Sequence, residues 1–231
     1  IEKQPVTIDW DANAAEKAGY EHFMLKEIYE QPKTINDTIS PRIKDNDIVI
    51  EELNMSDEEI KEITKIHIVA CGSAYHTGVT AKYVIEGLAR IPVEVDVASE
   101  FRYRDPILQK GNMVIVISQS GETADTLAAL RESRERGFKV LGIVNVVGSS
   151  IAREADSVMY TWAGPEIAVA TTKAYSAQLT ALYMLAMKFA RVRGTIDQEK
   201  FAGMLTDLRC LPDQIELLLG QKEKIQHFAN R

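Results

Sequence analysis

The sequence predicts an α/β fold, a three-layer sandwich in which helices cover both faces of a five-stranded, mainly parallel sheet. Two observations predict this fold. Between residues 66 and 192, short apolar runs rich in Val and Ile alternate with longer segments of helical periodicity, which is typical of right-handed βαβ units. Clusters of glycine and hydroxyl residues also follow the apolar runs, as in loops that join a strand to the next helix. Sheets of this kind bind ligands beyond the carboxyl ends of their strands.

Residues 1–62 are predicted to be an N-terminal arm followed by helices. Residues 1–20 are polar, and a helix is expected over residues 20–31 because apolar side chains recur there at helical spacing, at Phe23, Met24 and Ile28. Pro32 follows and is expected to end that helix. Residues 33–62 are charged with little periodicity, so we expect short helices and loops.

The sheet domain is predicted to span residues 63–194. Its strands are expected at residues 66–71, 93–97, 113–118, 139–145 and 157–161. Its helices are expected at residues 78–91, 123–136, 149–155 and 172–191, with Gly137 and Gly194 ending the second and fourth. The side chains of the first helix expected to face the sheet are Val79, Tyr83 and Leu88. Residues 195–231 are predicted to form a helical tail on the apolar positions Phe201, Leu205, Leu208, Leu211 and Ile215.

Composition narrows the possible functions. The 231-residue chain has a net charge of −7, which disfavours nucleic acid and anionic membranes as partners. Cys71 and Cys210 lie far apart without metal-binding spacing, so we expect no disulfide, metal or cofactor. Neither a signal peptide nor an apolar run of about 18 residues is visible, and a cytoplasmic location is expected. An Ile at position 1 suggests an excised or trimmed chain.

The loop over residues 118–126 is the most informative segment. It offers three hydroxyls and one amide (Ser118, Ser120, Thr123 and Gln119) between a predicted strand and a predicted helix. Such a turn points backbone N–H groups and a helix N-terminus at one spot, where a dianionic phosphate is stabilised. Helix capping alone accounts for one hydroxyl, and Gly121 is expected to let the backbone approach the ligand closely. A serine nucleophile is not expected, because position 118 is not the glycine of Gly-x-Ser-x-Gly.

Two further loops are expected at the same edge of the sheet. In residues 71–78, Ala74 and Thr77 stand where a dinucleotide motif needs glycines, and no Gly-Lys-Ser/Thr occurs. Ser73 there is either a simple helix cap or a ligand donor. In residues 163–173, two threonines are natural helix caps, but the preceding apolar stretch is unusual for an exposed loop. It fits the wall of a sugar pocket to which Thr171 adds a hydroxyl.

Three other features favour structural interpretations. Cys71 ends a buried strand and is expected to be a core residue rather than a nucleophile. His76 has no carboxylate partner in its motif and is expected on a helix surface. The charged run over residues 131–136 is expected to be a solvated helix end.

Five segments, taken together, resemble a known family: residues 70–73, 118–126, 164–174, 22–32 and 98–104. They are similar to the sugar isomerase (SIS) domain family, whose fold is flavodoxin-like. Within it they resemble the isomerase part of the glutamine–fructose-6-phosphate aminotransferases, or glucosamine-6-phosphate synthases. The resemblance implies an enzyme that uses glutamine and fructose 6-phosphate to make glucosamine 6-phosphate for UDP-N-acetylglucosamine synthesis. It also implies a cytoplasmic homodimer with a glutaminase domain.

The resemblance covers the first of two SIS modules, with residues 195–231 leading toward the second. It implies a ligand, a hexose 6-phosphate such as fructose 6-phosphate or glucose 6-phosphate. It also implies that the phosphate is held by Ser73, Ser118, Gln119, Ser120 and Thr123, and that the sugar is lined by Val169, Ala170 and Thr171. No catalytic residue is expected in this chain, because relatives use groups of the glutaminase domain and second module. The chain alone is therefore expected to bind without turnover.

This sequence departs from the family pattern at three positions in two loops. Many relatives read Cys-Gly-Thr-Ser in the first loop, where this chain has Cys-Gly-Ser-Ala. Ala74 therefore lacks a hydroxyl that reaches the phosphate in relatives, a loss of about 1–3 kcal/mol if nothing replaces it. Thr171 replaces a common serine and keeps the hydroxyl.

Two alternative functions stay open from the sequence. SIS modules also occur in regulators that sense sugar phosphates, but these would need a DNA-binding segment, and no basic helix-turn-helix is visible. A standalone sugar-phosphate isomerase would need an acid–base pair near the phosphate loop, for which Glu166 and His76 are the candidates.

Overall fold

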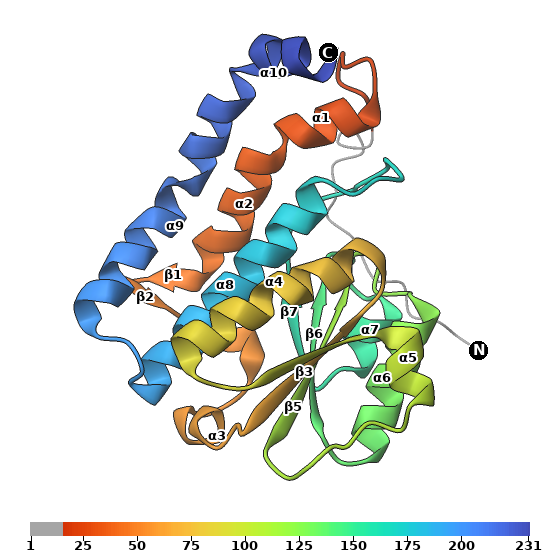
Figure 1. Ribbon diagram of the computed structural model, residues 1–231, viewed down its shortest axis with the longest axis vertical. Coiled ribbons are helices and arrows are strands. Elements are labelled where there is room, and N and C mark those ends of the chain that lie inside the picture. The colour runs from red at the N-terminus through yellow and green to blue at the C-terminus, as the bar shows by residue number, and fades with distance from the viewer. Residues whose placement is uncertain (1–15) are drawn as a thin grey trace.

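The structure is a computed structural model that describes residues 16–231. Its centre is a five-stranded sheet in the order β4-β3-β5-β6-β7, and all strand pairs are parallel (Figure 1). The strands are β3 (Lys65–Ala70), β4 (Val93–Val97), β5 (Asn112–Ser118), β6 (Lys139–Val144) and β7 (Ser157–Tyr160). The predicted five-stranded α/β sandwich is confirmed, and the sheet is parallel throughout.

Helices cover both faces of this sheet, as predicted. Figure 1 shows α4 (Gly72–Ala89) and α8 (Lys173–Arg193) on one side; α5 (Ala98–Tyr103), α6 (Ala124–Glu135) and α7 (Ser150–Glu154) lie on the other. Strand β5 contributes side chains to the cores on both faces of the sheet, because successive side chains of a strand point to opposite faces. Met113, Ile115 and Ile117 pack into the core beneath α4 and α8. Val114 and Val116 pack into the core beneath α5 and α6.

Helix α4 differs from the prediction at its start and in its buried face. It begins at Gly72 rather than Gly78, so the first loop is only the turn around Cys71. Tyr83 is 71% exposed, contrary to the expectation that it faces the sheet. The buried face is formed by smaller residues, Ala74, Gly78, Ala81, Ile85 and Ala89, which let the helix lie close to the strands. Helix α5 was not predicted.

The segment before the sheet contains α1 (Phe23–Tyr29), α2 (Gln31–Ile39), the 3-10 helices η2 (Ser40–Arg42) and η3 (Glu51–Leu53), and α3 (Asp57–Lys61). Pro32 opens α2 within its first turn, where a missing N–H donor costs nothing. The chain thus turns at Glu30 and continues as a second helix. A small antiparallel hairpin of β1 (Ile43–Lys44) and β2 (Asp47–Ile48) was not predicted. Most of the arm expected over residues 1–20 lies outside the described residues.

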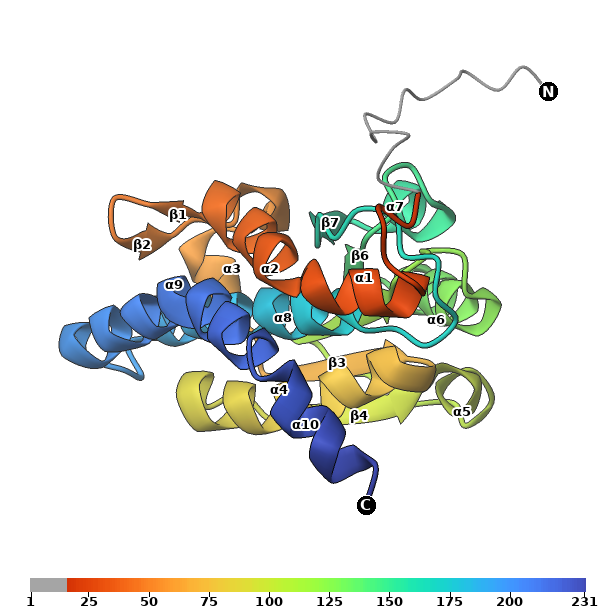
Figure 2. The same ribbon diagram turned by 90° about the horizontal axis from the view of Figure 1, so that it is seen from above.

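The predicted helical tail is confirmed as α9 (Gln198–Leu219) and α10 (Lys222–Ala229). Phe201, Leu205 and Leu208 are buried, and α9 packs against α2 on the outside of the molecule (Figures 1 and 2). Within residues 16–231, no helix has the combination of length and apolarity that a membrane span requires.

The close approach of α4 to the sheet generates a matched pair of predictions at two glycines of this helix. A Cβ at Gly78 would lie 2.8 Å from Ile68 Cγ2 and 3.1 Å from Val95 Cγ1, whereas a Cβ at Gly87 meets nothing within 4 Å. We expect Gly87→Ala to raise the free energy of unfolding by up to about 1 kcal/mol through helix propensity. Gly78→Ala should lower it by about 1 kcal/mol, because overpacking costs more than propensity gains. Urea denaturation checks both, and stabilisation by Gly78→Ala would contradict the packing described here.

Candidate functional site

Three loops at the carboxyl edge of the sheet enclose a pocket of about 230 Å³. They follow β3, β5 and β7, and their polar groups converge because the strands are parallel. The pocket is lined by Cys71, Ser73, Ala74, Ile117, Ser118, Gln119, Ser120, Thr123, Glu166, Ala168, Val169, Thr171 and Gln178. Seven of the eight residues predicted to bind sugar phosphate are therefore brought together. Ala170 is exposed and lies outside this lining.

The hydroxyls of the second loop divide into two kinds. The Ser118 hydroxyl accepts the N–H of Gly121 at 3.0 Å and shares a hydrogen bond with Thr123 Oγ1 at 2.9 Å. These two side chains shape the loop as well as line the pocket. Ser120 Oγ accepts the Glu122 N–H at 3.2 Å, which leaves its own proton available to donate. The side chains of Ser73 and Gln119 form no hydrogen bond within residues 16–231 and are available to a ligand.

Two helix N-termini open onto the pocket without a side-chain cap. Helices α4 and α6 begin beside it, and neither Cys71 nor Thr123 at the N-cap position forms a capping hydrogen bond. Uncapped N–H groups and the positive end of the helix dipole stabilise an anion. None of the described residues that line the pocket is Lys or Arg. The groups that the site offers to an anion are therefore neutral hydroxyls, the amides of Gln119 and Gln178, and two helix N-termini.

A glycine is needed at position 121 for a reason that the sequence did not reveal. Its φ is +66°, and a Cβ there would lie 2.1 Å from Ser149 Oγ. Its missing side chain thus makes room for Ser149, the residue before α7. Ser149 stands at the N-cap of α7 but makes no capping hydrogen bond, and its buried hydroxyl has no partner.

The loop after β7 is shaped by two polar side chains: Asn145, which was not predicted to contribute, and Glu166, which was considered only as an acid–base candidate. Asn145, directly after β6, accepts the Ala163 N–H at 2.8 Å and donates to the Gly164 carbonyl at 2.7 Å. Glu166 accepts hydrogen bonds from the Thr171 hydroxyl (2.7 Å) and the Thr172 and Ala174 N–H groups (2.9 and 3.1 Å). Glu166 thus caps α8 and holds Thr171 at the pocket. Asn145 and Glu166 were visible in the sequence, but their partners were not.

The first loop contains no replacement for the hydroxyl that Ala74 lacks. Beyond Ser73, the next Ser or Thr hydroxyl along α4, that of Thr77, is fully buried and donates to the Ala74 carbonyl at 2.7 Å. Thr77 does not line the pocket.

The structural interpretations of the isolated residues are supported. Cys71 packs against the core beneath α5 and α6 and accepts a hydrogen bond from Thr126 at 3.8 Å. His76 is exposed on α4 and does not line the pocket. The charged run is a solvated helix end in which Arg131 pairs with Glu154, and Arg134 with Asp156.

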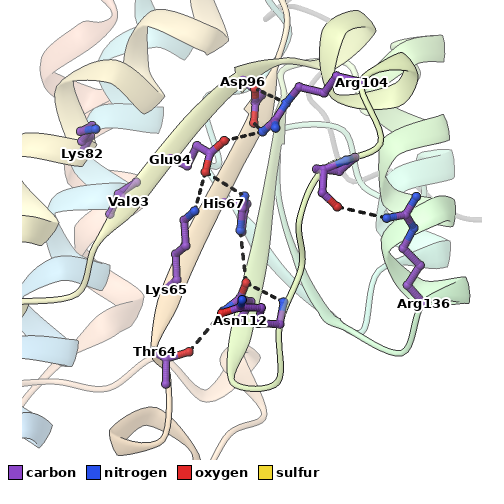
Figure 3. Close-up of polar contacts among 12 residues, drawn as sticks. Thr64, Lys65, His67, Lys82, Val93, Glu94, Asp96, Arg104, Asn112 and Arg136 are labelled. Atoms are coloured by element: carbon purple, nitrogen blue, oxygen red, sulfur yellow. Dashed lines mark hydrogen bonds and ion pairs between the residues drawn. The ribbon is translucent and has the colours of Figure 1, made fainter.

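A second polar cluster lies on β3 and β4, away from the pocket (Figure 3). Ligand atoms of His67, Glu94 and Asp96 lie within 4.8 Å of one another, as a metal site would require. Arg104 nevertheless pairs with both carboxylates, and Lys65 lies 2.5 Å from Glu94. The acidic charges are therefore already balanced, and the cluster is best described as an ion-pair network.

His67 is the buried member of this network. Asn112 Oδ1 accepts the Gln109 N–H at 3.0 Å, so this oxygen also accepts from His67 Nε2 at 3.3 Å. His67 Nδ1 then carries the lone pair and has no hydrogen-bond partner. Burial, and next the nearby Lys65 charge, lower the pKa of His67 below its usual value, while Glu94 and Asn112 oppose this shift.

A parallel sheet with helices on both faces and a polar pocket at its carboxyl edge defines an α/β protein of the flavodoxin-like class. Residues 59–188, more than half of the chain, match the family model of the SIS domain. The chain belongs to the SIS domain family, and the predicted resemblance is confirmed.

Relatives of known name share the similarity over almost the whole chain. The glutamine–fructose-6-phosphate aminotransferase [isomerizing] of Clostridium acetobutylicum is 59% identical over 230 residues, which are 99% of this chain and 38% of that protein. The enzyme of the same name from Caldanaerobacter subterraneus is 58% identical over 231 residues, with 100% and 38% covered. This chain therefore spans about 38% of the length of these relatives.

A solved structure shows the same fold. The C-terminal domain of glucosamine-fructose-6-phosphate aminotransferase from Francisella tularensis superimposes with a TM-score of 0.87 at 40% identity. The match covers 93% of this chain and 60% of that one. The predicted fold is thus confirmed by a related structure as well as by the strand order.

The burial of His67 predicts a pH dependence of stability. Because its pKa is lowered in the folded state, the unfolded chain binds a proton more readily. Its contribution to stability is present above the unfolded pKa of about 6.5 and is lost as the pH falls below it. We expect thermal unfolding midpoints to fall less steeply between about pH 7 and pH 5 in His67→Gln, which cannot titrate there. Equal slopes for both proteins would show that His67 does not contribute.

Proposed function

We propose that this chain binds a hexose 6-phosphate, such as fructose 6-phosphate or glucose 6-phosphate, in the pocket between the loops after β3, β5 and β7. The observation that carries the proposal is the pair of uncapped helix N-termini, α4 and α6, beside hydroxyls of the second loop. A charge-assisted hydrogen bond to phosphate contributes about 1.5–3 kcal/mol. Several such donors in one pocket favour a phosphate over a neutral ligand.

The lining suggests how the ligand lies. The phosphate is placed against Ser73 and the loop from Ser118 to Thr123, where the donors converge. The sugar then extends toward Val169 and Thr171, whose loop offers an apolar surface and one hydroxyl. Glu166, held beside Thr171, accepts hydrogen bonds from sugar hydroxyls. Ala170 is exposed and does not line the pocket, so we propose no ligand contact for it.

The proposed role is the sugar-phosphate-binding half of the isomerase part of a glutamine–fructose-6-phosphate aminotransferase. The support comes from named relatives that are 59% and 58% identical to this chain over almost its whole length. In that role the chain works with a glutaminase domain and a second SIS module, as a homodimer in the cytoplasm. The product, glucosamine 6-phosphate, supplies UDP-N-acetylglucosamine synthesis.

The alternatives have less support. A standalone isomerase would use Glu166 with His76, but His76 is outside the pocket lining and Glu166 is engaged in capping α8. A sugar-phosphate-sensing regulator shares the pocket but is not the function of the closely similar named relatives.

The phosphate-binding role predicts opposite changes in affinity for two substitutions in the lining. Ser120→Ala removes one donor and should weaken glucose 6-phosphate binding about tenfold or more. Ala74→Ser restores a hydroxyl in the first turn of α4 and should tighten binding. Isothermal titration calorimetry measures both, with the remote exposed Thr206→Ala as control. Unchanged affinity in Ser120→Ala and Ala74→Ser would refute the assigned site.

Binding without turnover is the second expectation. The described lining contains Cys71 and Glu166 as its titratable groups, and Glu166 is bound to the start of α8, so the chain lacks a positioned acid–base pair for isomerisation. Incubation of the 231-residue chain with fructose 6-phosphate and either glutamine or ammonia should yield no glucosamine 6-phosphate. Product above the level of a protein-free control would contradict this expectation.

A further inference from the structure

We propose that Glu27 on α1 is a positioning residue that holds the sugar-facing wall of the pocket in place. The inference rests on the proposed binding of a hexose 6-phosphate and assigns part of the affinity to a helix outside the sheet domain. The wall is defined as residues 167–171, of which Ala168, Val169 and Thr171 line the pocket.

The contact is direct and buried. Glu27 Oε1 accepts the backbone N–H of Ile167 at 2.6 Å and that of Ala168 at 3.1 Å. Glu27 is 2% exposed, so these hydrogen bonds form where water does not compete for them. Carboxylate bonds to N–H groups are among the stronger hydrogen bonds in proteins. The two residues joined to Glu27 lie 140 and 141 positions away along the chain.

Helix α1 is itself fixed to the start of α8, which gives Glu27 a defined position. Lys173 Nζ lies 2.7 Å from Glu30 Oε2, and Lys173 is 3% exposed. At the junction to α2, the Ser176 hydroxyl donates to Gln31 Oε1 at 2.5 Å. The helix that carries Glu27 is therefore joined at two points to the helix that follows the wall.

The wall depends on two carboxylates at its two ends. Glu166 holds Thr171 and the following backbone, whereas Glu27 holds Ile167 and Ala168. Between these anchors, Val169 is fully exposed. Loss of the Glu27 anchor leaves two N–H groups without partners and lets the first half of the wall move. Ordering it again on ligand binding then costs free energy.

Burial of the Glu27 carboxylate costs free energy of folding. This cost indicates that the side chain serves the contact with the wall rather than packing. Its Oε2 atom is buried and has no hydrogen-bond partner, and an unsatisfied buried oxygen is destabilising. A neutral glutamine would keep the acceptor that binds the wall. An alanine would remove it, and an aspartate would keep the charge on a side chain one methylene shorter.

The phosphate and sugar ends of the pocket are built from different segments, and this allows a sharp test. Inorganic phosphate should occupy the loops after β3 and β5, whereas glucose 6-phosphate should also contact the wall. We expect Glu27→Ala to weaken glucose 6-phosphate binding about tenfold and inorganic phosphate binding by less than about twofold. Glu27→Gln should stay close to the wild type. Glu21→Ala is the matched control, since Glu21 precedes α1 and its side chain is exposed.

Hydrogen–deuterium exchange provides a readout that needs no ligand. The Ile167 and Ala168 amides should exchange faster in Glu27→Ala than in the wild type, Glu27→Gln or Glu21→Ala. If Glu27→Ala does not fold, Glu27→Asp replaces it, because its shorter side chain cannot keep both contacts. Unchanged exchange at these amides would overturn the inference, as would equal weakening of both ligands. If the wild type binds neither ligand, the proposed function fails, and amide exchange still decides whether Glu27 holds the wall.

Discussion

The arrangement of the site depends on one constraint, the parallel order of β3 and β5 at the centre of the sheet. The chain leaves β3 through α4 on one face and leaves β5 through α6 on the opposite face. The two connections therefore diverge at a common edge, which creates a crevice between two helix N-termini. The register of the two strands aligns their carboxyl ends, since Ala70 pairs with Ile117. Ser73 and Ser118 then face one pocket although 45 positions separate them in the sequence.

The loop after β7 forms the third side of the pocket. It is positioned in a different way, because it does not follow a central strand of the sheet. It is held by side chains that satisfy backbone N–H groups: Asn145 at its start, Glu27 in its first half and Glu166 at its end. Buried backbone N–H groups need hydrogen-bond partners. Asn145 provides an amide oxygen, whereas Glu27 and Glu166 provide carboxylates at the cost of burying charge. The part of the pocket proposed to bind phosphate is thus positioned by the central strands, whereas the part proposed to bind the sugar is positioned by a few polar contacts.

The sequence predicted the features that depend on local pattern. Strand β4 was placed at its observed bounds, and the hydroxyls of the second loop were recognised because they are adjacent in the chain. Features set by tertiary partners were not predictable in this way. Pro32 was taken as a helix end, although the helix it opens is stabilised by packing against α8 and α9. The need for a glycine at position 121 comes from the neighbouring Ser149. Glu27 acts on a loop about 140 positions away along the chain. No periodicity or spacing carries that information.

The chemistry of the pocket also suggests why it suits a ligand that is bound and then released. Among the described residues that line it, hydroxyls and the amides of Gln119 and Gln178 supply the donors, and Lys and Arg are absent. The chain carries a net charge of −7, so long-range attraction of a phosphate is weak. Affinity must come from short-range donors and from the two helix ends, which act within about one turn. Such a site distinguishes between ligands by how well they fit it. A sugar phosphate whose sugar does not fit the wall gains only the contacts to its phosphate. Under the proposed function, we therefore expect selectivity among hexose phosphates to be set mainly by the wall that Glu27 and Glu166 hold.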